Sequence, residues 1–339
     1  MSPTVLTIVK AVVVVVFNLA LVAAMIYLER KILARMQHRV GPVKVGPHGL
    51  LQPIADIVKL ILKEDVTPRG ADRVIFTLAP IVAGTLGFLG YAPIPFGEDG
   101  WEVTRLNVGL LYVLMISSLM VYGVVLGGWA SNSKYSLLGG LRSSAQMISY
   151  ELGLGLSVLG VVMVSGSLDL RTIAEGQATG WNILNPALWL SFLVFSVCAY
   201  AEINRVPFDL PEAESELVAG YHTEYSSTKF ALFFLAEYAG LATMSAVAVT
   251  LFFGGWHGLG LVDLDRLPPW LQWYKVVAPT AIFFSKQLVL MLSAIWVRGT
   301  LPRLRYDQLM DFGWKVMVPV AGCNLVVVAI SYAVVNRWF

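Results

Sequence analysis

Long apolar segments alternate with short charged segments along the whole chain. The apolar side chains do not follow the every-other-residue alternation of a β-strand, and each segment is close to the roughly 20 residues that a helix needs to cross a bilayer. The pattern therefore predicts an all-α integral membrane protein, a single membrane domain over residues 1–339 with about eight transmembrane helices. The predicted helices cover roughly residues 5–28, 74–96, 107–131, 144–167, 184–201, 230–254, 275–297 and 315–336.

A shorter segment after the first apolar run has a different pattern. In residues 49–63 the polar side chains of Gln52, Asp56, Lys59 and Lys63 recur at helical spacing among apolar neighbours. This pattern predicts an amphipathic helix, too short to span, that lies at the membrane surface or against the bundle.

Composition supports the membrane assignment and excludes several functions. Hydrophobic residues make up 57% of the chain and charged residues 14%, whereas a soluble domain is about one-quarter charged. The two cysteines, Cys198 and Cys323, both lie in apolar runs, which excludes a four-thiolate iron–sulfur site within this chain. No dinucleotide or nucleoside-triphosphate motif is present, and the net charge of +2 gives no indication of nucleic-acid binding. The sequence therefore predicts no metal or cofactor bound by this chain alone.

The distribution of Lys and Arg predicts the orientation in the membrane. Of the 24 such residues, 17 fall in the connecting segments 29–73, 131–143, 202–229 and 298–315, and six fall on the alternate side. Because cytoplasmic loops carry the excess of positive charge, we expect both termini outside and segment 202–229 on the cytoplasmic side.

Segment 202–229 is acidic, although the connecting segments on its predicted side of the membrane carry an excess of positive charge. It has one arginine before residue 225, Arg205, and six carboxylates: Glu202, Asp209, Glu212, Glu214, Glu216 and Glu224. Pro207 and Pro211 interrupt helix formation, and good helix formers follow, so that Glu212 and Glu216 would share a face and raise one another's pKa. Two interpretations remain open here: a solvated acidic loop, or a polar funnel into the bundle whose carboxylates change protonation.

The charged residues within predicted helices include Glu151, Glu237 and Lys286. A charge in the bilayer is costly and usually faces the interior of the bundle. The two glutamates are therefore either structural hydrogen-bonding groups or parts of a proton relay. From the residues alone, both a secondary transporter and an energy-converting subunit that works with partner chains fit this pattern.

Four stretches resemble a known family: "GLLQPIADIVKLILKED", "AQMISYE", "EINRVPFDLPEAESELVAGYHTEYSSTKFALFFLAEY" and "RGTLPRLRYDQLMDFGWK". Together they are similar to the H-type membrane subunits of proton-pumping NADH:quinone oxidoreductases, respiratory complex I, and the resemblance extends over essentially the whole chain. In the loop "GPVKVGP", where the family commonly has "GPNRVGP", Lys44 keeps the positive charge.

The resemblance implies a role for each candidate residue. The acidic segment and two membrane glutamates would couple quinone reduction to proton translocation: Glu202, Asp209, Glu212, Glu214, Glu216, Glu224, Glu151 and Glu237. The membrane part of the quinone chamber would be lined by Arg30, Ala55, Asp56, Lys59, Arg142 and Arg205. Lys44, Arg298 and Arg303 would dock the hydrophilic arm.

The resemblance also implies the partners. Quinone would be the substrate, with its headgroup bound by a hydrophilic-arm subunit close to the terminal iron–sulfur cluster, and small membrane subunits would lie alongside in a bacterial or archaeal plasma membrane. FMN and the iron–sulfur clusters would reside in partner subunits. Two alternatives remain: a homologous subunit of a membrane-bound hydrogenase or of a ferredoxin- or F420-dependent dehydrogenase, and, outside the family, a stand-alone ion transporter.

Overall fold

The computed structural model describes residues 3–98, 101–211, 214–258 and 272–338. In these residues every regular element is a helix, which confirms the predicted fold class. Six spans are long and apolar enough to cross a membrane, and two shorter apolar helices accompany them, so that each of the eight predicted segments contains a helix. The chain is a multi-pass membrane protein.

The long helices make up most of the bundle. They are α1 (Pro3–Met36), α4 (Gly109–Ala130), α5 (Lys134–Ser165), α9 (Ser227–Phe252), α10 (Gln272–Thr300) and α12 (Val318–Trp338). Helix α11 (Tyr306–Asp311) continues through a π-helical turn at Phe312–Met317 into α12. Helix α9 is central, because every residue from Leu241 to Phe252 is buried.

The two shorter membrane helices differ in length from the predicted segments. Helix α3 (Arg73–Leu89) begins after Asp72, whose carboxylate accepts hydrogen bonds from the first turn, and ends at Gly90 rather than at residue 96. Helix α7 (Trp189–Glu202) begins five residues later than predicted, because Asn185 and Pro186 form a separate 3-10 turn (Pro186–Leu188) before it. Both differences follow from glycine and proline, which end helices within stretches that are apolar throughout.

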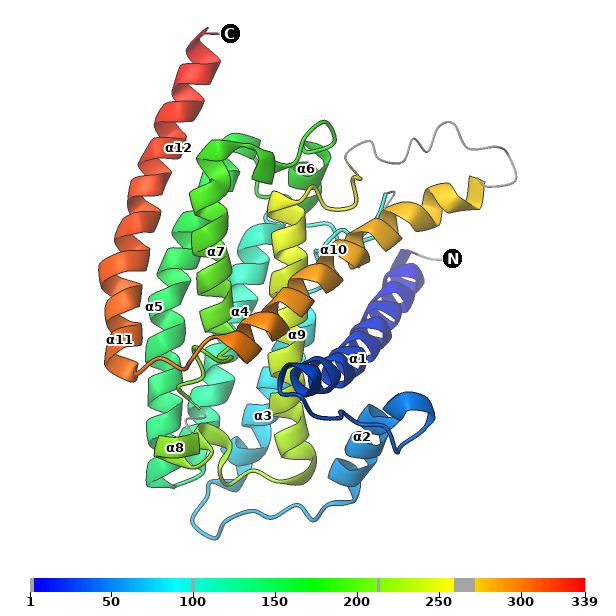
Figure 1. Ribbon diagram of the computed structural model, residues 1–339, viewed down its shortest axis with the longest axis vertical. Coiled ribbons are helices and arrows are strands. Elements are labelled where there is room, and N and C mark those ends of the chain that lie inside the picture. Colours follow the sequence, from blue (N-terminus) through cyan, green and yellow to red (C-terminus); the bar gives the residue numbers. More distant parts are fainter. Residues whose placement is uncertain (1–2, 99–100, 212–213, 259–271, 339) are drawn as a thin grey trace.

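The connecting segments form two distinct ends of the bundle (Figure 1). One end carries α2 (Gln52–Leu62) and α8 (Glu214–Leu217), and the opposite end carries α6 (Leu170–Glu175) and the C-terminal end of α12. Short 3-10 turns lie at Pro47–Gly49, Asn182–Leu184 and Gly220–His222. Helix α10 crosses the bundle obliquely and packs against α1 and α9.

The predicted amphipathic helix is α2. Ile54, Ile57 and Ile61 are at least half exposed on one side, while the Leu60 carbonyl on another side accepts a hydrogen bond from the Ser227 hydroxyl at the start of α9 (3.0 Å). Helix α2 therefore lies against the bundle with an apolar surface uncovered, as expected at a membrane interface.

Candidate functional site

Arg205 lies at the centre of a buried group of charges near the end of the bundle that carries α2 and α8. Its side chain is 2% exposed. Nη1 donates to Glu29 Oε2 (2.8 Å) and Nε donates to Glu237 Oε1 (2.5 Å). The guanidinium lies over the ring of Tyr238, 3.9 Å from its centroid. A second arginine, Arg298, donates to Glu29 Oε1. We refer to Glu29, Arg205, Glu237, Tyr238 and Arg298 as the Arg205 cluster.

The Arg205 cluster joins four parts of the chain. Glu29 comes from α1, Glu237 from α9 and Arg298 from α10, and Arg205 belongs to the acidic loop. The Tyr238 hydroxyl completes the group by donating to Glu29 Oε2 (2.9 Å). Two carboxylates and two guanidinium groups balance in charge, as buried ions must because an uncompensated charge in a low-dielectric interior is costly.

Glu29 is a member of the Arg205 cluster that the sequence analysis missed. It lies in the charged run at the end of the first apolar segment, where long side chains usually reach toward water, yet its side chain is only 5% exposed. The signal that could have identified it is helical spacing, because Val22, Met25 and Glu29 fall on one face of α1 and all three are buried.

The acidic loop has the interruption that its prolines predict. Residues 203–211 are non-helical, with a cis peptide bond between Val206 and Pro207, and α8 begins at Glu214. Asp209 and Glu224 are half-buried, and Glu212 lies outside the described residues.

The first residues of the loop are held by a glutamine on α5. The Gln146 side-chain amide donates to the carbonyl oxygens of Ala201 and Phe208, both at 2.7 Å, and lies 3.0 Å from Asn204 Oδ1. Gln146 therefore fixes the segment that carries Glu202 and Arg205 relative to α5.

Glu202 and Glu151 form a second acidic site, in which Glu202 is buried and Glu151 is half-buried. Glu202, the last residue of α7, is 4% exposed, and its Oε2 has no hydrogen-bond partner among the described residues. With Ser117 and Thr243 it lines a cavity of about 30 Å³ between α3, α4 and α9, which is room for one water molecule. The Glu151 side chain accepts a hydrogen bond from Ser118 and is near enough to repel a charge on Glu202.

The predicted chamber residues on α1 and α2 form their own pair. Arg30 Nη1 donates to Asp56 Oδ2 (2.5 Å), and Gln52 donates to the other oxygen of the same carboxylate (3.1 Å). Ala55 is half-buried and Lys59 is exposed on the same helix. Because Arg30 directly follows Glu29 on α1, this pair adjoins the Arg205 cluster along the chain.

Arg142 and Glu216 form an ion pair on the same end of the bundle. Arg142 Nη1 donates to Glu216 Oε2 (2.5 Å), and the Glu216 side chain is 49% exposed. This hydrogen bond lowers the pKa of the Glu216 carboxyl, and the charges of Arg142, Arg303 and Arg305 lower it further. The structure therefore brings the predicted residues Arg142, Glu216 and Arg303 into one electrostatic group.

Lys44 and Arg298, two of the three residues predicted to dock a partner, have different surroundings. Lys44 is exposed, whereas Arg298 is directed inward to Glu29. That these residues dock a partner stays a prediction.

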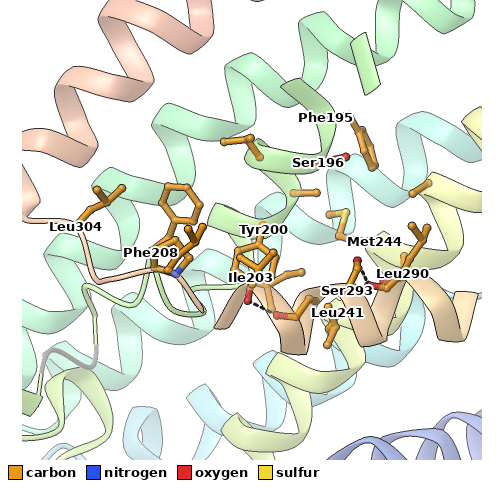
Figure 2. Close-up of a pocket in the computed structure, with 18 of the residues that line it drawn as sticks. Phe195, Ser196, Tyr200, Ile203, Phe208, Leu241, Met244, Leu290, Ser293 and Leu304 are labelled. Carbon is orange, nitrogen blue, oxygen red and sulfur yellow. Dashed lines mark hydrogen bonds between the residues drawn. The ribbon is translucent and has the colours of Figure 1, made fainter. Parts of the chain in front are cut away.

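A cavity of about 710 Å³ lies between α7, α9, α10, the start of the acidic loop and the segment from the end of α10 to Phe312 (Figure 2). None of the residues predicted to couple protons, line the chamber or dock a partner contributes to its wall.

The fold and the site define a multi-pass α-helical membrane protein with buried carboxylates and arginines beneath an acidic loop. A family model described as NADH dehydrogenase matches residues 9–329. One of the NADH-quinone oxidoreductase H subunits of Geobacter metallireducens is 50% identical over 95% of this chain and 94% of its own length. An H subunit of the same enzyme from Geobacter sulfurreducens is 50% identical over 95% of this chain and 93% of its own length. The H subunit from Deinococcus radiodurans is 50% identical over 99% of this chain and 85% of its own length.

The chain therefore belongs to the NADH dehydrogenase family defined by that model. The resemblance found in the four sequence stretches is confirmed.

Proposed function

We propose that this chain is the membrane subunit of an NADH:quinone oxidoreductase, in which it forms the membrane part of the quinone chamber and couples quinone reduction to proton translocation. The observation that carries the proposal is the Arg205 cluster, a charge-balanced group that joins the acidic loop to three membrane helices. Family membership and the names of the relatives support the same function.

The start of the acidic loop is placed to act on two acidic sites at once. Glu202 and Arg205 are three residues apart, and Glu202 lies beside Ser117 and near Glu151, while Arg205 contacts Glu29 and Glu237. A shift of this segment would change the surroundings of both sites. Because buried charges tolerate little imbalance, a change of charge in the chamber would be followed by proton uptake or release at these carboxylates.

The chamber itself would begin at α2. Arg30, Ala55, Asp56 and Lys59 would line its membrane side, and Arg142 would line it near Glu216. The quinone headgroup would bind a hydrophilic-arm subunit near the terminal iron–sulfur cluster, with FMN and the clusters held by partner chains. Both termini would lie on the outer side of the membrane.

If the chain were a hydrogenase-type subunit or a stand-alone transporter, we would expect its relatives to be named as such. A hydrogenase-type subunit or a stand-alone transporter is disfavoured because the relatives cited above are all named as H subunits of NADH-quinone oxidoreductase. Assembly with partners can be tested by tagging Phe339, purifying the chain in mild detergent and measuring NADH-driven reduction of a short-chain quinone. We expect activity that a quinone-site inhibitor blocks. A chain that purifies alone, or with partners but without NADH activity, would contradict the proposal.

The coupling role can be tested with Glu216→Gln. We expect quinone reduction and proton pumping to fall together, several-fold, with assembly intact. The matched control is Glu175→Gln, because Glu175 is 50% exposed and pairs with Arg171 at 2.9 Å at the other end of the bundle. Normal coupled turnover in Glu216→Gln would exclude this role for Glu216.

The chamber can be tested with Ala55→Leu. The larger side chain should raise the apparent KM for quinone by about tenfold, since it narrows the proposed path, while NADH oxidation by an artificial acceptor is unchanged. Equal losses in both assays would indicate misfolding rather than a narrowed chamber.

A further inference from the structure

The 710 Å³ cavity has an elongated apolar wall (Figure 2). On α10 it follows one stripe, with Leu290, Ala294 and Val297 at successive helical turns, and Leu301 follows directly after the helix. The seven residue steps from Leu290 to Val297 correspond to about 10 Å along the helix. The volume falls within the 300–1,000 Å³ that is typical of small-molecule sites.

Three of the four hydroxyl groups in the wall, those of Ser196, Tyr200 and Ser293, bond to nearby backbone. Ser196 Oγ donates to the Phe192 carbonyl (2.7 Å), Tyr200 Oη to the Ala294 carbonyl (2.9 Å), and Ser293 Oγ to the Leu290 carbonyl (2.6 Å). Because these hydroxyl protons are used in hydrogen bonds to the backbone, the described residues present a mainly hydrocarbon surface to the cavity. An apolar surface of this kind offers water few hydrogen bonds, and apolar atoms that filled the space would add packing contacts along the wall.

We propose that this cavity binds an acyl chain of a membrane phospholipid. The wall consists of α7, α9 and α10, of Ile203, Pro207 and Phe208 in the acidic loop, and of residues from the connection after α10 to the turn after α11. The three helices belong to the membrane-spanning bundle, so lipid chains are the surrounding solvent. A quinone tail is disfavoured, because no described residue of α1 or α2 contributes to the wall, and the proposed quinone path begins at α2.

The site also adjoins the Arg205 cluster. Val297 lines the cavity, and the next residue, Arg298, donates to Glu29. Tyr200, in the opposite wall, ties α7 to α10 through its hydrogen bond to Ala294. A bound chain would fill the space between α7, α9 and α10 and so keep the end of α10 that carries Arg298 in position.

The experiment is photolabelling of the intact assembly in native membranes with a phosphatidylethanolamine that carries a diazirine on one acyl chain. Adducts are mapped on peptides covering residues 190–205 and 286–303, and the lipid-exposed face of α4 at Leu111 and Met115 gives the reference for lipid that merely surrounds the protein. We expect labelling of cavity residues at least fivefold above that reference.

Two variants fill the site from different walls: Ser196→Phe on α7 and Ser293→Phe on α10. Both positions are exposed, and each hydroxyl donates to a backbone carbonyl of its own helix, so the hydrogen bond that each substitution removes is local and does not join elements of the fold. The matched control is Ser285→Phe on α10, which is also exposed, bonds to the Ile282 carbonyl (2.8 Å) and does not line the cavity. Cavity labelling should fall at least fivefold in both filling variants and stay unchanged in the control.

The proposal would be overturned by cavity labelling equal to that of α4, or by labelling that neither filling variant reduces. It would also be overturned if a diazirine-bearing isoprenoid quinone labelled the same peptides preferentially, or if these peptides were found in contact with a partner membrane subunit instead of lipid. The readout is adduct yield and not NADH or quinone turnover, so failure here leaves the proposed coupling function standing, and failure of that function leaves the lipid site standing.

Discussion

Two groups of buried charge lie near opposite ends of the bundle and are built differently. In the Arg205 cluster, two arginines are held by the side-chain carboxylates of Glu29 and Glu237. At the other end, beside α6, Lys286 donates to the carbonyl oxygens of Phe253 (2.7 Å), Gly255 (2.9 Å) and His257 (2.6 Å). Its ammonium also lies 4.3 Å from the centroid of the Trp181 ring.

Arg171, on α6, is another cation at that end. It binds both oxygens of Glu102, at 2.9 and 2.8 Å, and lies over the ring of Trp256. We refer to Arg171, Lys286 and these partners as the Lys286 group.

The Arg205 cluster and Lys286 differ in whether the partners of the cation can change their protonation. Backbone carbonyls do not titrate, so Lys286 has fixed partners that hold the loop after α9 against α10. In the Arg205 cluster each contact joins two side chains from different elements, and carboxylates can gain a proton. A change of charge can therefore pass between side chains of the Arg205 cluster, whereas we expect the contacts of Lys286 with backbone carbonyls to act mainly on stability.

The largest effect is expected from Arg205→Gln. Removing one partner of a buried ion pair costs about 3–5 kcal/mol, because the other charge stays buried without compensation. Here Glu29 and Glu237 both lose their ion pair with Arg205, although Glu29 keeps its contact with Arg298, so we expect less assembled complex on native gels and a loss of quinone reduction of more than tenfold. Arg205→Lys keeps the charge and should recover part of both. Normal assembly and turnover in Arg205→Gln would remove the distinction between the two groups.

Lys286→Met should have a smaller effect, confined to stability. Three carbonyl groups lose their charged donor, and a buried polar group without a partner costs about 1–3 kcal/mol. Tm should fall, while turnover per assembled complex stays unchanged. The control is Lys315→Met, because Lys315 is 72% exposed, pairs with Asp311 at the surface and should change neither quantity. Lost coupling at an unchanged Tm would show that the Lys286 group also takes part in energy conversion.

Hydropathy predicted where helices exist more reliably than where they end. Each predicted apolar segment contains a helix, because burial in a bilayer requires apolar side chains over the full length of a span. The ends at Gly90 and Asn185 were missed because local turn chemistry stops a helix inside an apolar stretch.

The site was predictable in composition but not in pairing. The acidic loop and Glu237 stand out in the sequence, yet the contact between Arg205 and Glu29 joins residues 176 positions apart. No local spacing encodes such a contact. The docking role of Arg298 came from the family resemblance and stays a prediction, and its contact with Glu29 follows from tertiary packing that the sequence did not indicate.

The smallest effect is expected from Arg142→Gln. Hydrogen bonding to Arg142 lowers the pKa of Glu216 below its usual 4.5, so this pairing contributes at neutral pH and is lost as the pH falls through the lowered pKa. Without Arg142 the pKa rises toward the usual value, and Glu216 takes up a proton at a higher pH during acidification. If turnover requires the ionised carboxylate, its acidic limb should move to higher pH by less than about one unit, because Glu216 is half exposed and solvent weakens the pairing.

The pH dependence of NADH:quinone turnover checks this shift, and two further variants test its origin. In the double variant Arg142→Gln/Glu216→Gln the shift should vanish, because the titrating group is gone. Arg171→Gln, in the Lys286 group, should leave the acidic limb where it is in the parent protein. A shift that survives in the double variant, or one of equal size in Arg171→Gln, would mean that the pH response does not arise at Glu216, and the contrast between the two ends would then rest on the Arg205 cluster alone.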